Sequence, residues 1–144
     1  MINVFQLSYE ARLNDWYDLR VRLEDSSLEE KCVEIDKWWQ KAPLVTHHLH
    51  PQDTDNWPDP WQLLSENIYC DVARGLGILY TIALLDRADL QHAELVLTDS
   101  GHNLVLANKE KYILNWERGS IVNTNQDISI KRRFTQHQAF QQYN

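Results

Sequence analysis

Three side chains in this sequence could together perform thiol chemistry: Cys70, His102 and Asn115. A thiolate can attack a carbonyl carbon, an imidazole can take the thiol proton and later return it, and a carboxamide can hold the imidazole in one tautomer. This combination is typical of acyl transfer from a peptide or isopeptide bond. The chemistry requires that separate elements of the chain bring the three side chains to one place.

Cys70 precedes the most apolar segment, Val72 to Leu85, in which only Arg74 and Thr81 interrupt apolar, small or glycine residues. Its length favours a helix, and a helix that is apolar all round belongs in the middle of a domain. If Asn67 caps this helix, Cys70 lies in its first turn, where unpaired N–H groups and the helix dipole stabilise a thiolate. The competing interpretation is a buried cysteine that packs as a small apolar residue.

The other two candidates belong to a predicted hairpin. His102 precedes the apolar run Asn103–Ala107, and Asn115 lies near the end of the next run, Lys111–Trp116. If these two runs pair as antiparallel strands, His102 and Asn115 fall near the same open end of the hairpin. A buried helix packed on that sheet could bring Cys70 to the same edge.

The remaining elements are helices in the first part of the chain and strands in the second. Apolar spacings of three and four residues predict helices at Tyr9–Leu23, Leu28–Gln40 and Pro60–Ser65. Strand-forming residues predict further strands at Ala93–Thr98, Ser120–Val122 and Ile128–Phe134, with the tail Thr135–Asn144 as an extended arm. This order predicts a single α+β domain over residues 1–144, in which the N-terminal helices and the central buried helix pack on one side of a small antiparallel sheet.

Composition and charge restrict the possible partners. Hydrophobic residues make up 43% of the 144 positions and the net charge is -7, which disfavours nucleic acid and anionic membrane surfaces as partners. No apolar run reaches the ~18 residues of a membrane span, and the N-terminus does not have the pattern of a signal peptide. We therefore expect a cytoplasmic protein whose substrate or partner is a peptide or a protein.

Cys32 and a histidine-rich loop give weaker signals. Cys32 lies on the apolar stripe of the helix predicted at Leu28–Gln40, so we expect it in the core, and in a reducing cytoplasm both thiols should be free. His47, His48 and His50 could bind a transition metal, but their spacing matches no closed zinc site. We expect no metal and no other cofactor.

The order of these motifs resembles the transglutaminase-like branch of the papain-like fold, and the bacterial transglutaminase-like cysteine proteinases in particular. In that family a tryptophan–proline segment and a short helix precede the cysteine, as Trp57–Leu64 does here. A Gly-His step followed by an apolar strand is similar to Gly101–Leu106. A following strand that ends in an acid-bearing step is similar to Tyr112–Trp116.

The resemblance implies a role for each candidate. Cys70 would be the nucleophile, His102 the base and then the acid, and Asn115 the residue that orients the imidazole. The backbone N–H of Cys70 would contribute to an oxyanion hole, with Tyr69 as the adjacent candidate for a second donor. The resemblance also suggests a bacteriophage-type member, located in the host cytoplasm or the virion.

The chain departs from the family pattern at three places. It has Ile68-Tyr69 where the family usually carries Gly-Asp, Val72 where an acidic residue is usual, and Asn115 where the third catalytic residue is usually aspartate. Two functions therefore stay open. One is a thiol-dependent hydrolase or amide transferase. The other is a catalytically silent transglutaminase-like fold that serves as a phage structural or adaptor protein, for which the six tryptophans and the polar tail would supply interaction surfaces.

Overall fold

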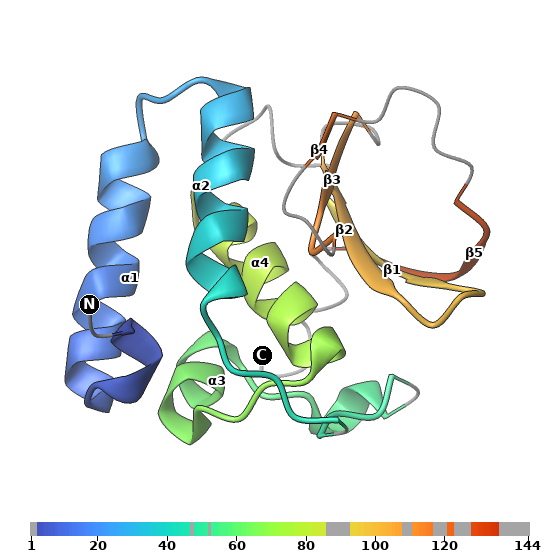
Figure 1. Cartoon of the computed structure of the whole chain (residues 1–144), viewed down its shortest axis with the longest axis horizontal. Helices are drawn as coiled ribbons and strands as arrows, with labels where there is room; N and C mark the ends of the chain where they lie inside the picture. The colour runs from blue at the N-terminus through green and yellow to red at the C-terminus, as the bar shows by residue number, and fades with distance from the viewer. Residues whose placement is uncertain are drawn as a thin grey trace.

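The computed structural model of the chain describes residues 3–46, 48–51, 53–85, 93–107, 111–116, 121–122 and 128–135. Over these ranges a layer of helices lies against one face of an antiparallel sheet (Figure 1). The predicted α+β class is therefore confirmed, with helices first in the chain and strands afterwards.

Helices occupy the described chain up to residue 85. Their bounds are η1 Val4–Gln6, α1 Tyr9–Leu23, α2 Leu28–Gln40, η2 Thr54–Asn56, α3 Pro60–Glu66 and α4 Asp71–Leu85. Side-chain caps mark the N-terminal ends of three helices. The side chains of Ser8, Ser27 and Asp59 each accept a hydrogen bond from the backbone N–H three residues further on. These caps explain why α1, α2 and α3 begin where the sequence predicted.

The central helix α4 begins at Asp71, three residues later than a cap at Asn67 would place it. The carbonyl of Cys70 accepts the first intrahelical bond, from the N–H of Arg74 at 2.9 Å, so Cys70 precedes the helix and does not lie in its first turn. Asn67 does not cap α4 as predicted, because it ends α3 in the left-handed conformation with φ 55°. Twelve of the fifteen residues of α4 are buried, which confirms the predicted central helix.

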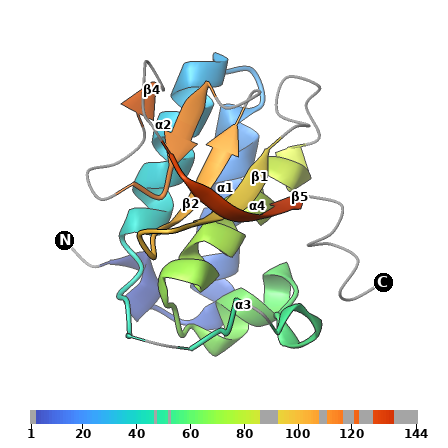
Figure 2. The same ribbon diagram turned by 90° about the vertical axis from the view of Figure 1, so that its right-hand side faces the viewer.

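In the described ranges five strands form the sheet in the order β4-β3-β2-β1-β5, and all of the pairs are antiparallel. Their bounds are β1 Glu94–Thr98, β2 Asn103–Ala107, β3 Tyr112–Leu114, β4 Ile121–Val122 and β5 Ile130–Thr135. The predicted hairpin is present as β2 and β3, with Val105 opposite Leu114. Figure 2 shows the face of the sheet that points away from the helices, with α2 and α4 behind it.

The two faces of the sheet pack in different clusters. Leu95, Val105 and Leu114 belong to the main core with the helices, whereas Val96 and Leu104 belong to a smaller cluster on the outer face. Side chains alternate between the faces along a strand. In β2, odd-numbered residues therefore face α4 and even-numbered residues face away from it.

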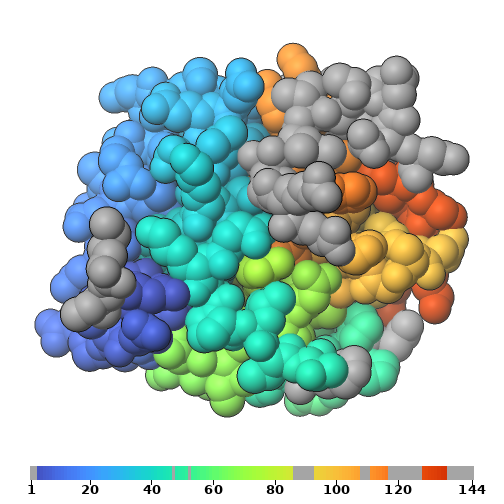
Figure 3. Space-filling model, viewed as in Figure 1, coloured from blue at the N-terminus to red at the C-terminus, as the bar shows by residue number. Residues whose placement is uncertain are grey.

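Aromatic residues hold the helices together. The hydroxyl of Thr81 on α4 accepts hydrogen bonds from the indole N–H groups of Trp16 and Trp39, at 2.9 and 2.8 Å, and donates to the carbonyl of Gly77 at 2.7 Å. A Cβ atom at Gly77 would lie 2.5 Å from the ring of Trp39, so only glycine permits this close packing. Little of α4 is visible between α2 and the sheet in the space-filling view (Figure 3).

Two further expectations can be compared with the described residues. Cys32 has 1% of its surface exposed, which confirms its predicted place in the core. Within the described part of the chain, no helix combines the length and the apolar character that crossing a membrane requires. The tail after residue 135, predicted as an extended arm, lies outside the described residues.

Candidate functional site

His102 and Cys70, which the sequence predicts as a pair, line two different cavities in the structure. His102 lies in the turn between β1 and β2, where its carbonyl accepts hydrogen bonds from the N–H and the hydroxyl of Thr98 at 3.0 and 2.9 Å. Its exposed side chain lines a cavity on the outer face together with Leu104 and Trp116. His102 is therefore in phase with the side of β2 that faces away from α4.

Cys70 lies on the inner side, at the start of α4. Its side chain is 3% exposed, and its sulfur accepts a hydrogen bond from the N–H of Leu49 at 3.4 Å. It lines a cavity of about 310 Å³ whose walls include Thr46, Leu49, Asp71, Thr98, Asn103 and Lys131. None of the described histidines is among the residues that line this cavity.

The histidine-rich loop contacts Cys70 through Leu49, and its two described histidines line a different cavity. His48 and His50 flank Leu49 in sequence and line a second cavity, in which His48 lies 3.7 Å from the carboxylate of Glu66. His47 lies outside the described residues. Among the residues that are described, no three histidine, cysteine or acidic side chains are grouped so that they could hold a metal ion.

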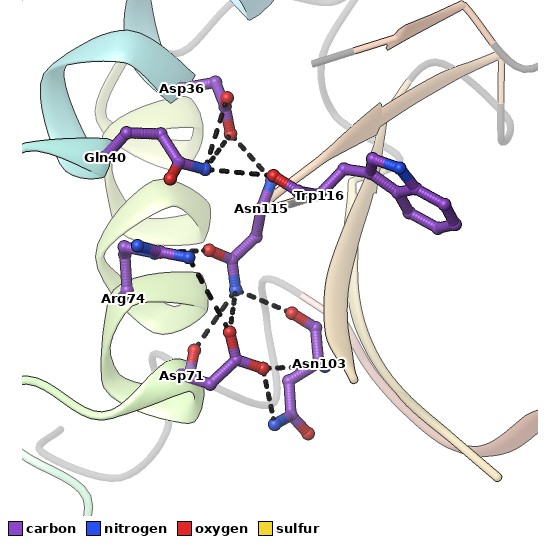
Figure 4. Close-up of polar contacts among 7 residues, drawn as sticks. All are labelled: Asp36, Gln40, Asp71, Arg74, Asn103, Asn115 and Trp116. Atoms are coloured by element: carbon purple, nitrogen blue, oxygen red, sulfur yellow. Dashed lines mark hydrogen bonds and ion pairs between the residues drawn. The ribbon is translucent and has the colours of Figure 1, made fainter. Parts of the chain in front are cut away.

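Asn115 does reach the start of α4, but its partners differ from those predicted. Its side-chain nitrogen donates to the carbonyl of Asn103 at 2.6 Å and to the carbonyl and carboxylate of Asp71 at 3.2 and 3.3 Å (Figure 4). Its side-chain oxygen accepts from Nε of Arg74 at 2.7 Å. The carboxamide thus joins α4 to the β2–β3 hairpin, and its bonds to described residues include none to an imidazole.

Asp71, the first residue of α4, is the second link between this helix and the sheet. One oxygen of its carboxylate accepts from both the backbone N–H and the side-chain amide of Asn103, each at 2.9 Å. The other oxygen lies 3.8 Å from the guanidinium of Arg74. A carboxylate is also favoured at this position by the dipole of the helix.

Asp36 and Gln40 extend the contacts to α2. The carboxylate of Asp36, which is 1% exposed, accepts from the backbone N–H of Asn115 at 2.7 Å. The amide of Gln40 donates to the carbonyl of Trp116 at 3.3 Å. We use the term polar network for the six residues that connect α2, α4, β2 and β3 in this way: Asp36, Gln40, Asp71, Arg74, Asn103 and Asn115 (Figure 4).

The charge at the centre of the polar network is a buried guanidinium. Arg74 is 9% exposed, and burial lowers its pKa, while the carboxylates of Asp71 and then Asp36 act in the opposite direction. An arginine remains charged in proteins. Two carboxylates and a carboxamide surround this charge, so removal of any one of them leaves a buried charge less well compensated.

The polar groups of the network bind one another. Its carboxamide is already bound on both sides, by Arg74 through oxygen and by Asn103 and Asp71 through nitrogen. Its carboxylate at Asp71 is occupied by the amide groups of Asn103. The bonds instead fix the distance between the central helix and the sheet, which is a structural role.

Tyr69 also lies away from the cavity. Its ring is fully buried between Phe5 and Trp39, with centroid distances of 5.2 and 5.9 Å, and burial raises the pKa of its phenol. Its carbonyl accepts from the N–H of Val45 at 2.7 Å. The structure therefore places the Tyr69 side chain in the aromatic core.

The sequence contained a signal for part of the polar network. Arg74 is a charged residue within an otherwise apolar helix, and a buried guanidinium requires carboxylate or carbonyl partners. Asp71 lies one helical turn before it, at a spacing that allows contact. Asp36 and Asn103 come from other elements, and their participation depends on packing and strand phase.

A comparison of the chain with protein-family models, curated proteins and solved structures finds no match in any of the three. The family resemblance of the motifs therefore stays a prediction from the sequence.

Proposed function

We propose that this chain is a catalytically silent structural or adaptor protein with a transglutaminase-like arrangement of helix and sheet. The observation that carries the proposal is the partner set of Asn115. Where a catalytic orienting residue would hold an imidazole, Asn115 holds Arg74, Asp71 and Asn103.

The position of His102 supports the same proposal. A nucleophilic thiol requires a general base within hydrogen-bond reach. His102 is in phase with Leu104 and lines the outer cavity, whereas Cys70 lines the inner one. The two cavities share Thr98 in their walls, but neither is lined by both Cys70 and His102.

A protein partner is consistent with the exposed side chains. Tyr17 on α1 and Trp61 on α3 are 59% and 44% exposed, and aromatic residues of this kind are frequent anchors of interfaces. Trp57, in contrast, is 4% exposed and packs on Phe134, so it belongs to the core. The resemblance to phage-type proteins makes a virion component the partner class that we propose.

A second candidate function rests on the surroundings of Cys70. Its sulfur lies at the start of a fifteen-residue helix, receives the N–H of Leu49 and lines a cavity, as the nucleophile of a peptide hydrolase or amide transferase would. This function requires a base other than His102. Of the described residues in the cavity wall, only Lys131 carries a basic side chain.

Two substitutions, each introduced into the gene where it naturally occurs, distinguish the structural function from the enzymatic one. Cys70→Ala and His102→Ala should each leave the biological function intact, because in a silent protein neither side chain takes part in a reaction. Circular dichroism of the purified variants is the control for folding. Loss of function in Cys70→Ala with an unchanged spectrum would favour the thiol enzyme, and loss in both variants would restore the predicted pair.

A further inference from the structure

The outer face of the sheet carries a cavity that the polar network does not use. It has a volume of about 370 Å³ and lies where the β1–β2 turn, the start of β2 and the segment before β5 meet. Trp116 follows Asn115 directly, yet Figure 4 shows its ring on the opposite side of the strand from the network. Asn115 has a backbone φ of 62°, and at this residue the side chains of Asn115 and Trp116 point to opposite sides of the strand.

The floor of the outer cavity is apolar. It is formed by Leu104, which is 2% exposed, and by the partly buried side chains of Ile128 and Trp116. Such a floor favours the aliphatic part of a ligand, and an indole ring additionally attracts a cation placed over its face.

A fixed carboxylate stands at the rim. Asp99 is exposed, its carboxylate accepts a hydrogen bond from the hydroxyl of Ser129, and its backbone N–H donates to the carbonyl of Ser129 at 3.0 Å. These two bonds connect the β1–β2 turn to the segment before β5. They hold the carboxylate at the cavity, so that a ligand need not order it.

The chemistry of the cavity selects among ligands. An anion would be repelled by Asp99 and by the net charge of -7. A neutral apolar group would gain nothing from the carboxylate. A side chain with an aliphatic stem and a cationic end matches all three features, because its stem can contact Leu104 and Ile128 while its charge lies between Trp116 and Asp99.

We infer that the outer cavity is a binding site for a lysine or arginine side chain presented by a partner protein. This inference goes beyond the proposed function, since it names a surface and the chemistry of its partner. It does not depend on whether Cys70 reacts, and the two can fail separately.

The test is a titration of ¹⁵N-labelled protein followed by NMR, with the indole resonance of Trp116 assigned by its loss in Trp116→Phe. The probe is the blocked tripeptide Gly-Arg-Gly, and its matched control contains citrulline, which keeps the shape of arginine without the charge. We expect saturable shifts of the Trp116 indole with the arginine peptide, at a dissociation constant on the order of millimolar for a single side chain. We expect no saturable shift with the citrulline peptide.

Asp99→Asn should weaken binding of the arginine peptide roughly five-fold, the effect of losing one exposed ion pair. The asparagine can still accept from Ser129, so the fold should persist. Asp55→Asn removes another exposed carboxylate, one that does not line the cavity, and should bind as the wild type does. The inference is overturned by the absence of saturation with arginine, by equal shifts with citrulline, or by unchanged affinity in Asp99→Asn.

Discussion

Replacing Asn115 with alanine should lower the free energy of unfolding by about 3–5 kcal/mol, as expected when a buried charged network loses one member. Arg74 would lose the acceptor that lies 2.7 Å from its Nε atom, and the carbonyl of Asn103 would lose a donor. Alanine at φ 62° adds about 1 kcal/mol of backbone strain. Urea denaturation followed by circular dichroism measures the change.

Asn115→Gly is the matched control. Glycine adopts positive φ without strain, so this variant should be about 1 kcal/mol more stable than Asn115→Ala while lacking the same hydrogen bonds. If Asn115 were only an orienting residue of a catalytic site, its loss would leave the fold nearly intact. A destabilisation below about 1 kcal/mol in Asn115→Ala would contradict the structural role of the polar network.

Thr81→Val should destabilise the protein by about 2–4 kcal/mol, because two buried indole N–H groups lose their acceptor and each unsatisfied donor costs about 1–3 kcal/mol. Valine has nearly the shape of threonine, so packing changes little. Trp16 and Trp39 both donate to this one hydroxyl, which is fully buried on α4. Urea denaturation again measures the difference.

Thr81→Ser tests the origin of the effect. Serine keeps the hydroxyl and removes one methyl group, which should cost only about 1 kcal/mol. The difference between the valine and serine variants therefore reports the hydrogen bonds to the indoles. Equal destabilisation of the two variants would show that packing, and not hydrogen bonding, determines the contribution of Thr81.

The helices were predictable because their signals are local. Ser8, Ser27 and Asp59 cap the helices that follow them, and apolar spacing marks the buried faces of α1 and α2. Asn67 ends α3 and does not cap α4, and both positions suit asparagine, which favours N-terminal caps as well as the left-handed conformation at C-terminal ends. Only two residues, Ile68 and Tyr69, separate it from Cys70, so the sequence alone does not distinguish the two roles.

The predicted site depended on a property that the sequence did not determine, the phase of β2. Both faces of this strand are apolar, because the outer face packs in its own cluster around Val96 and Ile113. Alternation therefore could not tell whether His102 or Asn103 faces α4. In the structure Asn103 does, and it bonds to Asp71, whereas His102 lines the outer cavity.

The central claim, that Cys70 is not an activated nucleophile, is tested most directly by its rate of alkylation with iodoacetamide at neutral pH. Peptide mapping would compare native protein with chain unfolded in guanidinium chloride, and Cys32 serves as the internal reference for a buried thiol. We expect Cys70 to react more slowly in the native protein than in the unfolded chain, because its side chain is 3% exposed and must open to react. His102→Ala should leave that native rate unchanged. A native rate above that of the unfolded chain would contradict the account, and a decrease of that rate in His102→Ala would identify His102 as the base.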